Sequence, residues 1–222
     1  MKSKARKGLL LVFIAALLTL IGQIVAVIGT IIGGDTLLGG KVIESDTVFS
    51  QFLIPMILLL NSALVGIAAT IIDLVGLYKA SKQANGYLPA FVFSIFLILA
   101  QIVTACASAF VPKLQNNKIS DVAVDLVMII ITTFVIQTTI QLLKEKGHEK
   151  LAKFGKTTLF IYVIGTMLNL LMKLFSGFLL FIPNGADWLL IASGIIAVAI
   201  VILTPLYEVF YVIFLGCAFK KV

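Results

Sequence analysis

The chain has 222 residues, of which 61% are hydrophobic and only 12% are charged, and its mean hydropathy is +1.16. This composition excludes an intrinsically disordered protein and an ordinary soluble domain. The net charge of +7 does not indicate a nucleic-acid partner, because the basic residues form separate clusters between apolar runs, where anionic lipid headgroups would meet them.

Six apolar runs fill most of the sequence, and each is long enough to cross a bilayer. They predict transmembrane helices at residues 8–32, 52–78, 88–111, 120–143, 157–182 and 188–219. We therefore predict an all-α integral membrane protein, a bundle of six transmembrane helices in which residues 1–222 form a single membrane domain.

The first run follows a basic segment and so resembles a signal peptide in outline. It is too long for the hydrophobic region of a signal peptide, and no convincing cleavage site follows it, so we expect the helix to be retained. Gly22, Ala26, Gly29 and Gly33 recur on one of its faces, a pattern that favours close helix packing. That packing is expected within the chain, and a homodimer through Gly29 and Gly33 is the alternative.

The second and third runs carry residues that we expect at the boundary between lipid and water. Tyr78 and Tyr87 lie near the ends of these runs, as residues of an aromatic belt do. Asp73 lies close to the same boundary, six residues before Lys79. We expect Asp73 to pair with a cytoplasmic lysine rather than to bind an ion.

The fourth and fifth runs each contain a charged residue inside the span. Counting from the helix ends places Asp125 and Lys173 at a similar depth in two antiparallel neighbours, so we predict an ion pair. Gln23 and Asn61 reach the same level, and Asn169 shares a helix face with Lys173. These five residues form our predicted substrate-binding site, a polar cavity in the outer half of the bundle where Lys173 would meet an anionic solute.

Two other interpretations of this polar layer stay open. In the first, Lys173 extends to the outer headgroups and Asp125 lies in interfacial water, so neither residue binds a solute. In the second, the two residues form a purely structural ion pair inside the bundle.

The sixth run contains Glu208 three residues after Pro205, near the middle of the predicted helix. A proline inside a helix removes one backbone hydrogen bond and favours a kink. Thr204 and Tyr211 are predicted to share a face with Glu208. The spacing predicts a proton- or ion-coupling site at Glu208 beside a hinge; the alternative is a neutral or hydrogen-bonded carboxyl inside the bundle.

Thirteen of the 17 basic residues fall on one side of the membrane if the six helices alternate in direction. By the positive-inside rule, that side is cytoplasmic and holds both termini. A weak repeat, in which an aromatic residue precedes a mid-helix amide in the odd-numbered helices, also suggests three helical hairpins. Such matches arise by chance in apolar sequence, so a true repeat and coincidence both stay open.

The sequence offers little for catalysis. His148 is the only histidine and lies in the charged connector 144–156, of which we interpret residues 144–150 as a solvated linker. No serine or cysteine has a histidine base nearby in the sequence, and no His/Glu pair has the spacing of metal ligands. Cys106 and Cys217 are expected near opposite faces of the membrane, so we predict no disulfide. We expect a protein that is not an enzyme and that binds no metal or other cofactor.

Two classes of function fit these features. The first is a small transporter, or a membrane-embedded solute-binding transport subunit, in a bacterial plasma membrane. The second is a non-transporting accessory, immunity or assembly protein that binds another membrane protein in the bilayer. A solute site predicts a cavity among the polar residues, whereas an interaction protein predicts a tightly filled bundle with a polar or small-residue face turned outward.

Overall fold

A computed structural model describes residues 3–37, 53–110, 118–178 and 187–222. These residues contain six helices and no strand. The helices are α1 (Ser3–Leu37), α2 (Ile54–Ser81), α3 (Tyr87–Phe110), α4 (Lys118–Glu145), α5 (Glu149–Phe178) and α6 (Asp187–Lys221). Each contains a segment long and apolar enough to cross a membrane, which confirms the predicted all-helical architecture with six candidate spans.

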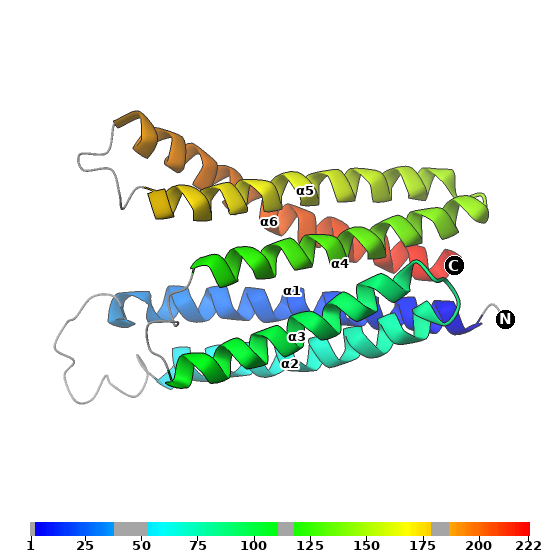
Figure 1. The fold of residues 1–222 in the computed structure, drawn as a ribbon, viewed down its shortest axis with the longest axis horizontal. Helices are drawn as coiled ribbons and strands as arrows, with labels where there is room; N and C mark the ends of the chain where they lie inside the picture. The colour runs from blue at the N-terminus through cyan, green and yellow to red at the C-terminus, as the bar shows by residue number, and fades with distance from the viewer. Residues whose placement is uncertain (1–2, 38–52, 111–117, 179–186) are drawn as a thin grey trace.

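The six helices run along a common long axis (Figure 1). Their contacts close them into a ring. Each helix contacts the next one in the sequence, and α6 returns to contact α1. The start of α1, the end of α6 and the connectors α2–α3 and α4–α5 lie together, so neighbouring helices alternate in direction (Figure 1). We call this the terminal end of the bundle, and the opposite one the distal end.

The start of α5 differs most from the predicted boundaries. The helix begins at Glu149 and not at residue 157, so most of the charged connector 144–156 is helical. Lys150, Lys153 and Lys156 are exposed, whereas Ala152 is buried on the other face of the same turns. The predicted start of α5 was wrong because a charged segment with one small apolar face can extend a helix beyond its apolar span.

The short connector between α4 and α5 has a defined geometry. Gly147 adopts a φ of 75°, a conformation that glycine reaches without a steric penalty. Its N–H donates to the carbonyl of Lys144 at 2.9 Å, and the N–H of His148 donates to the carbonyl of Leu143 at 2.8 Å. This pair of bonds is a Schellman motif, which ends α4 and turns the chain directly into α5.

The α1–α2 hairpin packs through glycines. A Cβ atom on Gly8 would lie 2.6 Å from the backbone nitrogen of Ala80, so the two backbones meet with no room for a side chain. Gly22 and Gly29 also face α2, where added Cβ atoms would lie 3.5 and 3.2 Å from its side chains. The predicted packing of the small-residue face within the chain is therefore confirmed for these two positions, and the surroundings of Gly33 lie outside the described residues.

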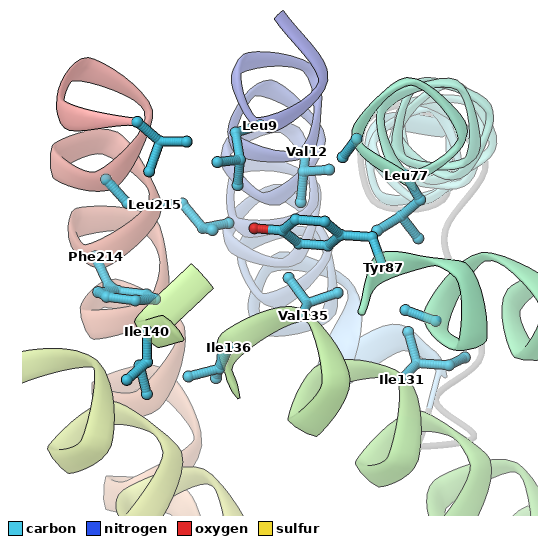
Figure 2. Close-up of a cluster of buried hydrophobic side chains, with 14 of the residues drawn as sticks. Leu9, Val12, Leu77, Tyr87, Ile131, Val135, Ile136, Ile140, Phe214 and Leu215 are labelled. Atoms are coloured by element: carbon cyan, nitrogen blue, oxygen red, sulfur yellow. The ribbon is translucent and has the colours of Figure 1, made fainter. Parts of the chain in front are cut away.

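The buried core lies toward the terminal end. Figure 2 shows its members from α1, α2, α3, α4 and α6: Leu9, Val12, Leu77, Tyr87, Ile131, Val135, Ile136, Ile140, Phe214 and Leu215. Toward the distal end, by contrast, large apolar side chains cover the outer surface, among them Ile31 and Val201, which are 74% and 73% exposed. Such a surface suits contact with lipid.

Tyr87 is the central residue of this core and was predicted wrongly as part of an interfacial aromatic belt. Its side chain is fully buried and reaches from α3 into the space between α1, α4 and α6 (Figure 2). The hydroxyl of Thr139 donates to the carbonyl of Val135 at 2.7 Å, so the Tyr87 hydroxyl donates to Thr139 Oγ1 at 2.8 Å. Burial is tolerated because this hydrogen bond satisfies the phenol. Tyr78, by contrast, is exposed, as predicted.

Candidate functional site

A partly enclosed cavity of about 500 Å³ lies inside the ring of helices, and residues of all six helices line it. Its volume falls within the range of small-molecule sites, roughly 300–1,000 Å³. Val12, Ile131 and Val135 belong both to the cavity wall and to the buried core in Figure 2. The packed core therefore bounds the cavity toward the terminal end.

Two acidic side chains line the cavity, Asp73 from α2 and Glu208 from α6. Glu208 Oε1 accepts a hydrogen bond of 2.7 Å from Gln23 Nε2 of α1. Asp73 makes no hydrogen bond or ion pair within the described residues, so the expected pairing with a cytoplasmic lysine is not found there. The two carboxyls thus differ, since Glu208 accepts a hydrogen bond from an amide, whereas Asp73 lies near Tyr211 without a hydrogen bond.

Small residues on α2 leave the space in front of Asp73 open. Gly66, Ala69 and Thr70 precede it by seven, four and three residues, and all of them line the cavity. A Cβ atom on Gly66 would meet no atom within 4 Å. Because positions at these spacings share one helix face, α2 turns a stripe of small side chains inward and places Asp73 at its end.

Three tyrosines form an aromatic wall of the cavity. The ring of Tyr207 in α6 lies with its centroid 4.3 Å from that of Tyr162 in α5, and 5.7 Å from that of Tyr211 one turn later. All three line the cavity. Thr132 of α4 lies beside Tyr162 and Tyr207, and it lines the cavity as well. Three aromatic rings and several hydroxyls therefore meet in one place.

The remaining polar lining is neutral. Ser94 and Gln101 come from one face of α3, and Thr19 comes from α1. Ser94 donates its hydroxyl to the carbonyl of Ala90 at 2.8 Å, which leaves the lone pairs of its oxygen for a ligand. Among the described residues that line the cavity, none is lysine, arginine or histidine. The site therefore combines acidic, aromatic and neutral polar groups without a basic one.

The predicted ion pair is confirmed, but it lies outside this cavity. Lys173 Nζ lies 2.6 Å from Asp125 Oδ2, and the two side chains are 32% and 20% exposed. Asn61 is exposed and Asn169 is half-buried, and neither lines the cavity. Gln23 reaches the cavity only through Glu208. Of the five residues predicted to bind substrate, the structure thus joins Asp125 to Lys173, and none of the five lines the cavity itself.

Around Glu208, the structure agrees with part of the predicted face. α6 continues through Pro205, and Glu208 and Tyr211 both line the cavity. Thr204 is exposed and does not line it. The bond from Gln23 matches the interpretation of Glu208 as a hydrogen-bonded carboxyl inside the bundle, and its coupling role stays a prediction.

The sequence analysis did not predict the tyrosine wall. Tyr211 was predicted only to share a face with Glu208, and no prediction involved Tyr207. The usable signal for Asp73 was its place on the stripe with Gly66 and Thr70. No local pattern predicts that α5 and α6 bring three tyrosine rings together, because this contact depends on how the two helices cross.

No cluster of three or more metal-ligating side chains occurs within residues 3–37, 53–110, 118–178 and 187–222. Cys106 and Cys217 are exposed and are not joined in a disulfide. In chemical terms, the cavity can bind a small polar or charged molecule through carboxylate, hydroxyl and aromatic contacts. Comparisons of the chain with protein-family models, with curated proteins and with solved structures gave no match.

Proposed function

We propose that the protein is a small polytopic membrane transporter, or the membrane-embedded solute-binding subunit of a transport complex, with the cavity as its solute site. The observation that carries this proposal is a cavity lined from all six helices of a bundle whose helices can each cross a membrane. Polar and ionisable groups within apolar spans are costly in lipid and characteristically mark solute and ion pathways.

The proposed location is a bacterial plasma membrane, with both termini in the cytoplasm. The basic clusters support this orientation, because Lys79, Lys82, Lys144, Lys220 and Lys221 all lie at the terminal end of the bundle. In this orientation the packed core faces the cytoplasm, and the cavity lies on its outer side. The single arginine and the short connectors are in keeping with a bacterial protein.

Glu208 is the proposed site of proton or ion coupling. It lines the cavity three residues after Pro205 and accepts a hydrogen bond from Gln23. A change in the charge of Glu208 would therefore alter the contact between α6 and α1. A proline interrupts the backbone bonding of α6 one turn earlier, which makes this part of the helix the natural place for a hinge.

Asp125 and Lys173 are assigned a structural role in this proposal. They neutralise each other across the contact between α4 and α5 and line no part of the cavity. Of the five residues predicted to bind substrate, only Gln23 contributes to the proposed site, through its hydrogen bond to Glu208. Asp73 and the tyrosines would contact the solute directly.

A non-transporting accessory or assembly protein is the second candidate. Asn61 in α2 and Gln137 in α4 are exposed within candidate spans. An amide that faces lipid is costly, and it is relieved when a partner helix accepts its hydrogen bonds. These two side chains would mark the faces that a membrane-protein partner, or a second copy of the chain, covers.

Access of aqueous reagents to the cavity separates the two candidates. Thr132→Cys would be introduced into protein that carries Cys106→Ser and Cys217→Ser, then reconstituted in vesicles. It would be treated from each side with the impermeant thiol reagents trimethylammonium-ethyl and sulfonatoethyl methanethiosulfonate. A solute site predicts that one of them modifies Thr132→Cys from at least one side, whereas the core variant Ile136→Cys stays unmodified.

A second pair of variants checks that modification occurs through the cavity. Gly66→Leu fills the open space in front of Gly66 and should slow the modification about tenfold or more, because the side chain occupies the path of the reagent. Gly194→Leu is the control, since its Cβ also meets no atom within 4 Å, but Gly194 does not line the cavity. Failure of both reagents from both sides would overturn the proposed transport function and favour the interaction protein.

A further inference from the structure

We propose that the cavity binds a small organic cation, with its ammonium or guanidinium group between the carboxylate of Asp73 and the tyrosine wall of α5 and α6. This inference rests on the proposed function and names the chemical class of the solute. It replaces the anionic solute that the sequence suggested through Lys173.

The charges of the lining support a cation. Asp73 and Glu208 face the cavity, and no described lining residue carries a positive charge. Lys173, near the distal end of α5, is engaged with Asp125 outside the cavity. An anion would meet two carboxyls with nothing to neutralise it, which is the arrangement that excludes anions.

The two carboxyls have different surroundings, and this difference identifies Asp73 as the group that would bind the cation. Gln23 donates to Glu208, whereas Asp73 has no hydrogen bond or ion pair within the described part of the chain. A charged group that is withdrawn from bulk water requires a partner. Because the protein supplies none for Asp73, a cationic ligand would complete the site.

The aromatic wall favours an organic cation over a metal ion. Tyr162, Tyr207 and Tyr211 lie with neighbouring ring centroids 4.3 and 5.7 Å apart, and all three line the cavity. Rings grouped in this way attract ammonium groups through their negative π-faces, most strongly where water is excluded. A metal ion would instead require several oxygen ligands converging at about 2–2.6 Å, and no such cluster occurs among the described residues.

The size and the neutral groups of the cavity fit the rest of such a molecule. About 500 Å³ is far more than a bare ion fills and accommodates a solute with an organic chain. Ser94, Gln101 and Thr132 line the cavity and supply hydroxyl and amide groups for a polar substituent on that chain.

Choline and its neutral isostere 3,3-dimethyl-1-butanol have almost the same shape but differ in charge. A comparison of their affinities therefore shows whether binding requires a positive charge. Calorimetric titration of the purified full chain in detergent measures these affinities. Tetramethylammonium and guanidinium serve as further cations, and 3,3-dimethylbutyrate serves as the anion. At least one cation should bind, and choline should exceed its neutral isostere about tenfold or more, because only the cation gains the carboxylate and π contacts.

Variants locate that preference within the cavity. Asp73→Asn should lower the affinity for the cation about tenfold or more, while Asp125→Asn, outside the cavity, should leave it unchanged. Tyr207→Phe keeps the ring and should retain binding, whereas Tyr207→Leu removes the ring and should weaken it about tenfold. Unfolding temperatures of the same variants show whether each protein is folded.

Each failure has a distinct meaning. If Thr132→Cys is modified in vesicles but no cation binds, or if the neutral isostere or the anion binds as tightly as choline, the cavity remains a solute site and the cation proposal is wrong. Unchanged affinity in Asp73→Asn also overturns it. If Thr132→Cys is unreactive from both sides, the proposed transport function itself is wrong.

Discussion

The helices contact one another differently in the two halves of the bundle. At the terminal end, glycines bring α1 and α2 into backbone contact, and Tyr87 joins α3 to the core. Beyond that core the same helices separate around a cavity of about 500 Å³, where polar side chains lie among apolar ones. A helix in this ring therefore packs against its neighbours at one end and lines a cavity further along.

The difference has a physical cause in side-chain size and polarity. Where α1 and α2 meet at Gly8, a missing side chain lets two backbones touch. At Gly66 the same residue type faces empty space and opens the cavity instead. Glycine stabilises the contact in the first case through close packing and provides volume in the second. The role of a small residue thus depends on whether a neighbouring helix reaches it.

The largest effect is expected from truncating the core at Phe214. Phe214→Ala removes a fully buried ring and should lower the free energy of unfolding by about 3–5 kcal/mol. Phe160→Ala is the matched control, because Phe160 is 66% exposed and should change stability by less than about 0.5 kcal/mol. Both values can be measured by denaturant titration in mixed micelles. Equal losses would show that the terminal core is not the stable half.

Closing the contact between the helix backbones should cost slightly less. Gly8→Ala places a Cβ 2.6 Å from the backbone of Ala80 and should lower the free energy of unfolding by about 2 kcal/mol, since the hairpin must separate. Gly194→Ala should leave stability unchanged or raise it by up to about 1 kcal/mol, because alanine favours the helix and nothing lies nearby. A stabilised Gly8→Ala protein would contradict the close approach.

Much of the fold follows from the sequence, because hydropathy and length constrain it directly. The six spans are readable from apolar runs, and the end that gathers the basic clusters also holds both chain termini in the structure. The start of α5 was not readable, since Ala152 and its neighbours form too narrow an apolar face among lysines. The burial of Tyr87 was also missed, because its partner Thr139 lies 52 residues away.

The candidate site was less predictable than the fold for a related reason. Depth along a span can be counted, so the meeting of Asp125 and Lys173 was predicted correctly. The direction in which a side chain faces around the helix depends on the packing of all its neighbours. For this reason Asp73 was assigned to the boundary although it lines the cavity, and Asn61 was assigned to the cavity although it does not line it.

A smaller effect is expected at the hydrogen bond in the core. Tyr87→Phe removes the hydroxyl that donates to Thr139 and should lower the free energy of unfolding by about 1 kcal/mol. The exposed Tyr78→Phe should change it by less than about 0.5 kcal/mol. A double variant with Thr139→Val tests the assignment, because the loss on removing the Tyr87 hydroxyl should then largely disappear.

The smallest effect is expected at the ion pair beyond the cavity. Lys173→Met should lower the free energy of unfolding by about 0.5–1 kcal/mol, since partly exposed ion pairs contribute little. It should leave the affinity for choline unchanged, because neither member of the pair lines the cavity. Asp125→Asn in the same background should add almost nothing, as the pair is already broken. A large loss of choline binding in Lys173→Met would place the solute site at Lys173, as the sequence predicted. It would also contradict the assignment of a structural role to the ion pair and of solute binding to the acidic, aromatic cavity.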